Sequence, residues 1–281
     1  MSSPVVIAGQ GALAESLHAR LSPTHHVRLA TVDYTCLHEA EVALAGARTV
    51  VMLARAEEPV ARLPRADVAE LDRLMADSVA RAARAVGASR LVLAARGADD
   101  VQAELLARSG VPLVVAQHEL DALATHAGPA VDAPSATVTR REPKERLTCS
   151  IHRYRRPRGM TALDFARAYF EWLPRDTPLT RVVEREGTFT IFVGGVRALV
   201  LRHVPGRSSE HLAWLEPLDG ALVDRSATGR FEFRVLLDEE TVLASLIDFR
   251  PALPFPLYRF TQAVMHERSM RHFRAWLEAR A

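Results

Sequence analysis

The chain has 281 residues, of which 48% are hydrophobic and 25% charged, with a formal net charge of +2. This length suits two domains of roughly 100–200 residues each, and the small net charge argues against a nucleic-acid partner or a membrane surface. There is no apolar run of about 18 residues, no charged and apolar leader, and no paired spacing of its two cysteines, so we expect no membrane span and a cytoplasmic location.

The first half of the chain alternates short apolar segments with helical ones. Strands are expected at 4–8, 27–32, 49–54, 90–95 and 111–116, and helices at 12–21, 68–86 and 101–107. Gly87 and Gly110 follow two of these helices, where glycine is a favoured stop. Near-continuous apolar strands between helices predict a doubly wound parallel α/β sheet of the Rossmann type, covered on both faces.

Aromatic residues divide the chain. Of its seventeen aromatic residues (10 Phe, 3 Trp and 4 Tyr), only Tyr34 precedes residue 150. Two cores of such different composition indicate two domains. Turn-forming residues gather at 128–134, so we expect the join between 128 and 146, with domains at 1–135 and 146–281.

The second half predicts an α+β domain. A strand at 146–154 precedes a helix at 162–173, for which Thr161 is a suitable N-cap. Further strands are expected at 180–184, 188–193, 198–204, 211–215, 230–236 and 241–249. Turn pairs such as Glu186-Gly187 and Gly194-Gly195 make these hairpins of an antiparallel sheet. A long closing helix at 256–279 would leave room for a cavity between itself and the sheet.

A glycine pattern follows the first strand. Residues 9–14 read G-x-G-x-x-A, in which the glycines allow a tight turn close to a pyrophosphate and Ala14 lets the helix pack on the strand. Phosphates would lie at the helix N-terminus. Asp33, 22 residues after Gly11, would bind a ribose diol and favours NAD, whereas Arg28 favours NADP. A tight turn without ligand and a solvated Asp33 remain the alternatives.

The candidate cofactor-binding residues belong to this turn and to the ends of the second and third strands. They are Gly9, Gly11, Ala12, Leu13, Ala14, Asp33 and Ala54.

Residues 4–123 resemble atypical short-chain dehydrogenases/reductases of the extended or NmrA-like kind. The resemblance lies in segments 5–14, 50–54, 83–93 and 102–115, and it implies a Rossmann domain that binds NAD or NADP. Members of the family often have the pattern G-x-x-G-x-x-G, and here Ala8 and Ala14 take the positions of its first and last glycines. The chain also lacks the family's Tyr-x-x-x-Lys catalytic pair. Its only lysine is Lys144, and no tyrosine lies between Tyr34 and Tyr154.

Residues 146–280 resemble the SRPBCC helix-grip superfamily more loosely. The resemblance lies in 231–235, 241–249 and the segment 250–259 that enters the last helix. It implies an apolar ligand cavity between the sheet and that helix.

A few further side chains have two interpretations each. His118, after the fifth strand, is either a general acid at the ligand-binding edge of the sheet or a surface residue. Tyr258 and His266 on the last helix either line a cavity or face solvent. The arginines within 153–158 are either a solvated run or contacts for an anion.

These observations predict an atypical NAD(P)-dependent oxidoreductase that acts on a hydrophobic small molecule, with no catalytic residue assigned and no metal. The alternative is a non-catalytic protein that binds a nucleotide and a small molecule, as a sensor or scaffold. A third possibility is that the Rossmann half is vestigial and the second half carries the function. The substrate, the proton donor and the oligomeric state are not assigned from the sequence.

Overall fold

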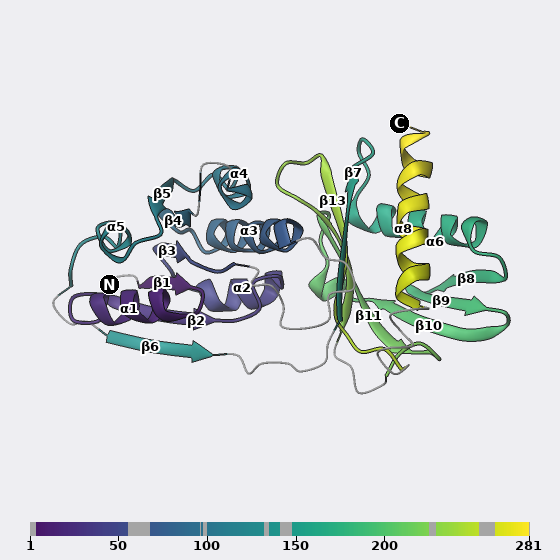
Figure 1. Ribbon diagram of the computed structural model, residues 1–281, viewed down its shortest axis with the longest axis horizontal. Helices are drawn as coiled ribbons and strands as arrows, with labels where there is room; N and C mark the ends of the chain where they lie inside the picture. The colour runs from purple at the N-terminus through teal and green to yellow at the C-terminus, as the bar shows by residue number, and fades with distance from the viewer. Residues whose placement is uncertain are drawn as a thin grey trace. The chain divides into compact units, whose positions relative to one another are not determined.

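The computed structural model describes residues 4–55, 68–95, 97, 100–131, 135–140, 148–224, 229–252 and 262–280. The chain divides into two units, 1–58 with 71–143, and 59–70 with 144–281. The division after residue 143 lies later than residue 135, the end expected from the sequence, because residues 135–140 form a strand of the first unit. Figure 1 labels most of the elements of both units.

The first unit is built on a six-stranded parallel sheet in the order β5-β4-β3-β1-β2-β6. Its elements are β1 (Val5–Ala8), α1 (Ala12–Leu21), β2 (His26–Thr31), α2 (Leu37–Leu44), β3 (Thr49–Met52), α3 (Val68–Ala85), β4 (Arg90–Ala95), α4 (Val101–Ala107), β5 (Leu113–Gln117), α5 (Leu120–Ala124) and β6 (Ser135–Arg140). The predicted doubly wound parallel sheet is confirmed.

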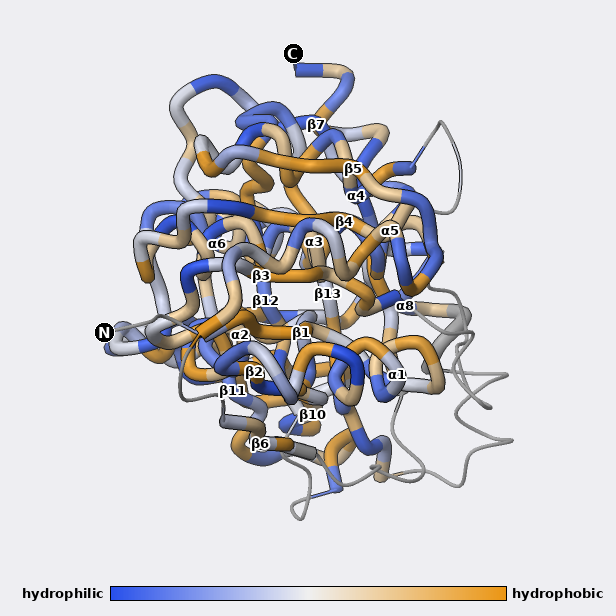
Figure 2. The backbone as a smooth tube through the Cα atoms, turned by 90° about the vertical axis from the view of Figure 1, so that its left-hand side faces the viewer, coloured by the Kyte–Doolittle hydropathy of each residue, from blue (hydrophilic) through white to orange (hydrophobic). Residues whose placement is uncertain are grey.

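The central strands of this sheet are hydrophobic along their whole length. β1 and β3 are buried at every position, and Figure 2 shows the apolar strands β1, β3, β4 and β5 stacked in order. Side chains of α1 and α5 share one hydrophobic cluster with one face of the sheet. Right-handed crossovers then place α2, α3 and α4 on the opposite face.

Three elements of the first unit are absent from the expectations: α2, α5 and β6. The last of these pairs residue by residue with β2, from His26 opposite Ser135 to Thr31 opposite Arg140. Its sequence, SATVTR, has one large apolar residue, and Val138 is 48% exposed. Because backbone pairing rather than burial holds this edge strand, hydrophobic periodicity gives no sign of it.

The second unit is a seven-stranded antiparallel sheet in the order β7-β13-β12-β11-β10-β9-β8. Its elements are β7 (Thr148–Arg155), α6 (Ala162–Asp176), β8 (Thr180–Arg185), β9 (Thr188–Val193), β10 (Val196–His203), a short 3-10 turn η1 (Pro205–Arg207), β11 (Leu212–Asp219), β12 (Arg230–Val235), β13 (Thr241–Phe249) and α8 (Gln262–Glu278). The expected α+β arrangement is confirmed.

Both helices of the second unit pack on the same face of its sheet, where aromatic rings form the core. Phe273 of α8 is fully buried and contacts the rings of Phe165, Tyr169 and Trp172 on α6. α6 begins with the expected cap, since the Thr161 hydroxyl accepts from the Asp164 N–H in a reciprocal capping box. No helix within the described ranges is both long enough and apolar enough to cross a bilayer.

Candidate functional site

Gly9 ends β1 at a point of close backbone contact. The N–H groups of Leu53 and Ala54 both donate to the Ala8 carbonyl at 2.8 Å, which draws the end of β3 against the end of β1. A Cβ placed on Gly9 would lie 2.9 Å from both Ala54 N and Leu53 Cβ. Only glycine fits there, so this residue is required by the fold whether or not a ligand binds.

Gly11 is a different kind of glycine. It precedes α1 with φ 90° and ψ 179°, a conformation that L side chains avoid, and no side chain caps the helix. A Cβ on Gly11 would have no atom within 4 Å. The first amides of α1 thus have no side-chain cap and lie at the positive end of the helix dipole, which is the arrangement that binds phosphate.

A pocket of about 260 Å³ lies over this turn. It opens beyond the ends of β1 and β3, where the strand order reverses and open α/β sheets bind their ligands. Five predicted residues line it: Gly9, Gly11, Ala12, Leu13 and Ala54. Ala14 does not line it, because this side chain is buried under α1 against the sheet.

Asp33 also lies outside the pocket lining. Its carboxylate accepts hydrogen bonds from the Thr35 N–H at 3.0 Å and from the Thr35 hydroxyl, which brace the turn after β2. The Arg28 guanidinium donates to the carbonyls of Ala43 and Ala45, at 2.7 and 2.9 Å, where α2 ends. The two residues proposed to choose between NAD and NADP thus each have a structural role, and neither lines the pocket.

Arg55 is a pocket residue that the sequence did not indicate. Its guanidinium forms a two-pronged ion pair with Asp100, and both side chains are buried, with 6% and 4% exposed. Asp100 in turn caps α4 by accepting from the Gln102 N–H at 3.0 Å. Arg55 Nε is buried and has no hydrogen-bond partner within the described ranges. An unpaired buried donor beside a pocket is a feature that a polar ligand would satisfy.

Two other pocket residues bear on proton transfer. The Tyr34 hydroxyl is buried and donates to the Ala30 carbonyl at 2.8 Å, and burial raises the pKa of this phenol well above its usual range. Tyr34 is therefore unsuited to donate a proton to a substrate. His118 is exposed and lines the pocket, so the structure brings this candidate general acid to the predicted site.

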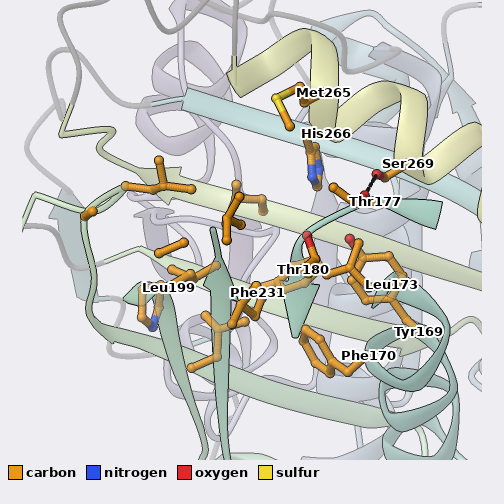
Figure 3. A pocket seen from close by; sticks show the side chains of 18 of the residues that line it. Tyr169, Phe170, Leu173, Thr177, Thr180, Leu199, Phe231, Met265, His266 and Ser269 are labelled. Carbon is orange, nitrogen blue, oxygen red and sulfur yellow. Dashed lines mark hydrogen bonds between the residues drawn. The ribbon is translucent and has the colours of Figure 1, made fainter. Parts of the chain in front are cut away.

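The second unit contains its own cavity, with a volume of about 450 Å³ (Figure 3). It lies between α6, α8 and strands β8 to β13, as expected for a sheet closed by a long last helix. Most of its wall is aromatic and aliphatic, including Phe170, Leu199, Phe231 and Leu246. A concave site of this size and character suits a small apolar ligand.

Besides the Tyr169 phenol, four polar side chains interrupt that wall, and we call these four the polar corner: Thr177, Thr180, His266 and Ser269. Thr177 and Ser269 share a hydrogen bond of 3.3 Å, and Ser269 donates to Asp176 at 3.2 Å. In Figure 3 the His266 ring projects from α8 toward Thr177 and Thr180.

The members of the polar corner differ in how well they are paired. Thr180 Oγ1 is buried and has no hydrogen-bond partner in the described part of the chain. Burial lowers the pKa of His266 to about 4. The sequence offered His266 as a cavity residue, which the structure supports, whereas Tyr258 lies outside the described residues. Thr177 and Thr180 carried no signal in the sequence.

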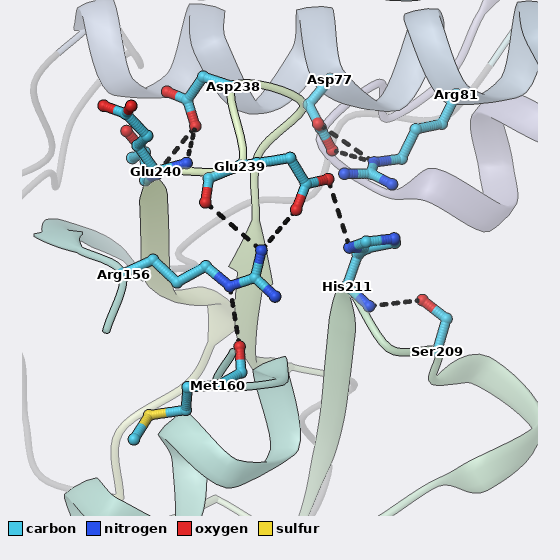
Figure 4. A network of polar contacts seen from close by, with 10 residues as sticks. Asp77, Arg81, Arg156, Met160, Ser209, His211, Asp238, Glu239 and Glu240 are labelled. Carbon is cyan, nitrogen blue, oxygen red and sulfur yellow. Dashed lines mark hydrogen bonds and ion pairs between the residues drawn. The ribbon is translucent and has the colours of Figure 1, made fainter. Parts of the chain in front are cut away.

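Arg156, which follows β7, is engaged in local contacts. Arg156 donates to the Met160 carbonyl at 2.8 Å and pairs with the Glu239 carboxylate, which also lies 3.8 Å from His211 (Figure 4). These contacts join the loop before α6 to the β12–β13 hairpin. Arg153 and Arg155 belong to β7 itself. Arg156 therefore gives no support to the interpretation that the arginines within 153–158 bind an anion.

Across the described ranges, no three His, Cys, Asp or Glu side chains gather closely enough to hold a metal ion.

No protein-family model matches the chain, and no curated protein matches it either. Solved structures do match. The Bordetella bronchiseptica enzyme WbmG in complex with NAD matches at 18% identity and a TM-score of 0.35, over 42% of this chain and 53% of its own. Uronate dehydrogenase from Agrobacterium tumefaciens matches at 21% identity and a TM-score of 0.29, over 34% of this chain and 41% of its own.

The chain thus spans about half the length of these structures or less. Likeness at this level says nothing about activity, so the two pockets must be judged on their own geometry.

Proposed function

We propose that this protein is an atypical oxidoreductase-like protein whose first unit binds a nicotinamide dinucleotide, NAD or NADP, and whose second unit binds a hydrophobic small molecule. The observation that carries the first half of the proposal is the pocket over Gly11 at the uncapped N-terminus of α1, where the strand order of the sheet reverses.

Other features of the pocket fit a dinucleotide. The uncapped amides of α1 would donate hydrogen bonds to the pyrophosphate oxygens. Arg55 Nε would donate a further hydrogen bond to the ligand. Because Asp100 already neutralises Arg55, the helix terminus supplies most of the attraction for the phosphates. The Asp33 assignment to the ribose stays a prediction, since binding would require its carboxylate to turn from Thr35.

The second unit supports the small-molecule half of the proposal. Its order of strand, helix, six strands and helix is the order that a helix-grip domain would have, and the cavity lies between the sheet and the last helix. We therefore keep the SRPBCC-like assignment as part of the proposal.

A bound nicotinamide would supply or accept the hydride, and the protein would position the substrate and move the proton. Tyr34 does not take the proton-donor role because its hydroxyl is buried and engaged with Ala30. His118 takes that role in the proposal, as an exposed side chain at the pocket.

A second candidate is a protein that binds both ligands without turnover. It is favoured by the engaged hydroxyl of Tyr34 and by the single lysine, Lys144, which lies outside the described residues. Cofactor oxidation with any carbonyl or alkene substrate would exclude this candidate.

The deciding experiment is a titration of the purified protein with NADH and NADPH, followed by nicotinamide fluorescence. Gly11→Asp places a carboxylate where the phosphates would lie and should abolish binding. Gly110→Asp is the matched control, because Gly110 also has a positive φ, of 77°, and open space around it but lies away from the pocket. Saturable binding retained in Gly110→Asp and lost in Gly11→Asp supports the proposal. No binding at millimolar cofactor refutes it.

A further inference from the structure

We infer that the cavity of the second unit selects uncharged ligands that are apolar along most of their length and carry one hydroxyl or carbonyl oxygen, which the polar corner receives. This inference rests on the proposal that the cavity binds a hydrophobic small molecule. It adds the chemical class of that molecule.

The polar corner has hydrogen-bonding capacity that the protein leaves unused. Thr180 Oγ1 is buried without a partner in the described part of the chain, and buried hydroxyls without partners are rare in folded proteins. Since Ser269 donates its only hydroxyl proton to Asp176, Thr177 must donate to Ser269. Thr177 Oγ1 therefore keeps lone pairs that can accept from a ligand.

These groups match a single small oxygen function. Thr180 can donate to a carbonyl or hydroxyl oxygen, and Thr177 can accept from a hydroxyl. His266 remains neutral near pH 7 because burial lowers the pKa of its imidazole, so one ring nitrogen donates and the other accepts. A ligand hydroxyl could use both kinds of partner, whereas most of the remaining wall offers apolar contact.

Charged ligands meet no counterion here. None of the described residues that line the cavity is Lys, Arg, Asp or Glu. The Tyr169 phenol, also in the wall, stays protonated because burial raises its pKa. Behind the corner lies the Asp176 carboxylate, which accepts from Ser269 and pairs with His272. A buried carboxylate or phosphate on the ligand would be unpaired and would face a charge of its own sign.

Part of the cavity lining that reaches the surface is apolar as well. Val196 and Met265 line the cavity and are 57% and 54% exposed.

The test compares four ligands of one chain length: 1-decanol, decanal, decane and decanoate. Displacement of the neutral dye Nile red is measured at pH 8, where decanoate is fully ionised. We expect decanol and decanal to bind more tightly than decane, and decanoate to bind at least roughly tenfold more weakly than decanol, the factor that one hydrogen bond or one uncompensated charge readily supplies.

Thr180→Val keeps the shape of the side chain and removes its hydroxyl. Because that hydroxyl is unpaired, the variant should fold normally, which circular dichroism will verify. It should weaken decanol binding by up to roughly tenfold and leave decane unchanged. Thr190→Val is the matched control, since Thr190 lies on β9 between the core-facing Phe189 and Ile191 and points to the other side of the sheet.

The outcomes separate the two levels of the proposal. Equal binding of decanoate and decanol, or equal losses for decanol and decane in Thr180→Val, would overturn the selection by the polar corner while leaving the cavity as a ligand site. Failure of Nile red and of all four ligands to bind the folded protein would remove the ligand site itself, and this inference with it.

Discussion

The two candidate sites of this protein are built from different materials. The pocket of the first unit is made mainly of backbone: two glycines, the uncapped amides of α1 and the converging ends of β1 and β3. The cavity of the second unit is made of side chains from two helices and six strands. A site of the first kind is encoded in a few adjacent residues, whereas a site of the second kind exists only after distant segments have packed.

The largest effect in the pocket of the first unit is expected at Arg55, a charged side chain in its lining. Arg55→Met removes the guanidinium that pairs with the buried Asp100 carboxylate, so we expect a loss of about 3–5 kcal/mol in the free energy of unfolding. Urea unfolding measures it. The double variant Arg55→Met/Asp100→Asn should recover much of the loss, because asparagine can still cap α4. A single variant as stable as the parent would show that the pair is not buried as described.

The side-chain-built cavity depends most on its aromatic core. Phe273→Ala removes a fully buried ring that contacts Phe165, Tyr169 and Trp172, and we expect it to cost about 3–5 kcal/mol. Phe192→Ala is the control, since Phe192 is only half-buried and stacks under Arg181. Similar unfolding midpoints for the two variants would contradict the packing described here.

Substitutions at Gly9 and Gly11 should distinguish a residue that the fold requires from one that cofactor binding requires. Gly9→Ala brings a Cβ to 2.9 Å from the backbone of Ala54, whereas Gly11→Ala meets only its unfavourable φ. We expect Gly9→Ala to lose more stability than Gly11→Ala, whose strain should cost about 1–3 kcal/mol. Thermal unfolding of both variants, alongside cofactor titration, checks the order. The reverse order would mean that β1 and β3 are not held so closely.

The smallest expected effect is a gain of stability. Pro178 and Leu179 form the turn before β8, in which Thr180 N–H donates to the Thr177 carbonyl at 3.1 Å. Leu179 has φ 64° and is 80% exposed. Leu179→Gly should therefore stabilise the protein by about 1 kcal/mol through relief of backbone strain. Leu179→Ala, which keeps the strain, is the control and should show no such rise in melting temperature.

Much of the fold could be predicted because its segments obey local rules. The helix at 12–21 and the strands at 90–95, 188–193 and 241–249 have the bounds expected from apolar periodicity and flanking turns. The helix α2 was missed although Leu37, Ala40 and Leu44 have helical spacing. Its eight residues gave too short a pattern to stand out from a loop.

The sites could be predicted only in part, because sequence patterns show only those site residues that are adjacent along the chain. The glycine turn is contiguous, so its pocket residues were found. Arg55 was not, because its meaning depends on Asp100, 45 residues further along the chain. Nothing in the sequence distinguishes Thr180 from the other threonines. Its role depends on the packing that buries its hydroxyl in the cavity that His266 also lines.

The position of β6 has a consequence for how the chain is made. It follows β5 in sequence but pairs with β2 at the opposite edge of the sheet. A ribosome adding about 5–20 residues per second needs roughly 5–20 s between finishing Thr31 and finishing Arg140. During that interval the backbone of β2 has an unpaired side, which is open to strands of other nascent chains. The late arrival of β6 prolongs the exposure of that edge, and the charged Arg28 within β2 is the kind of residue that discourages pairing with another chain.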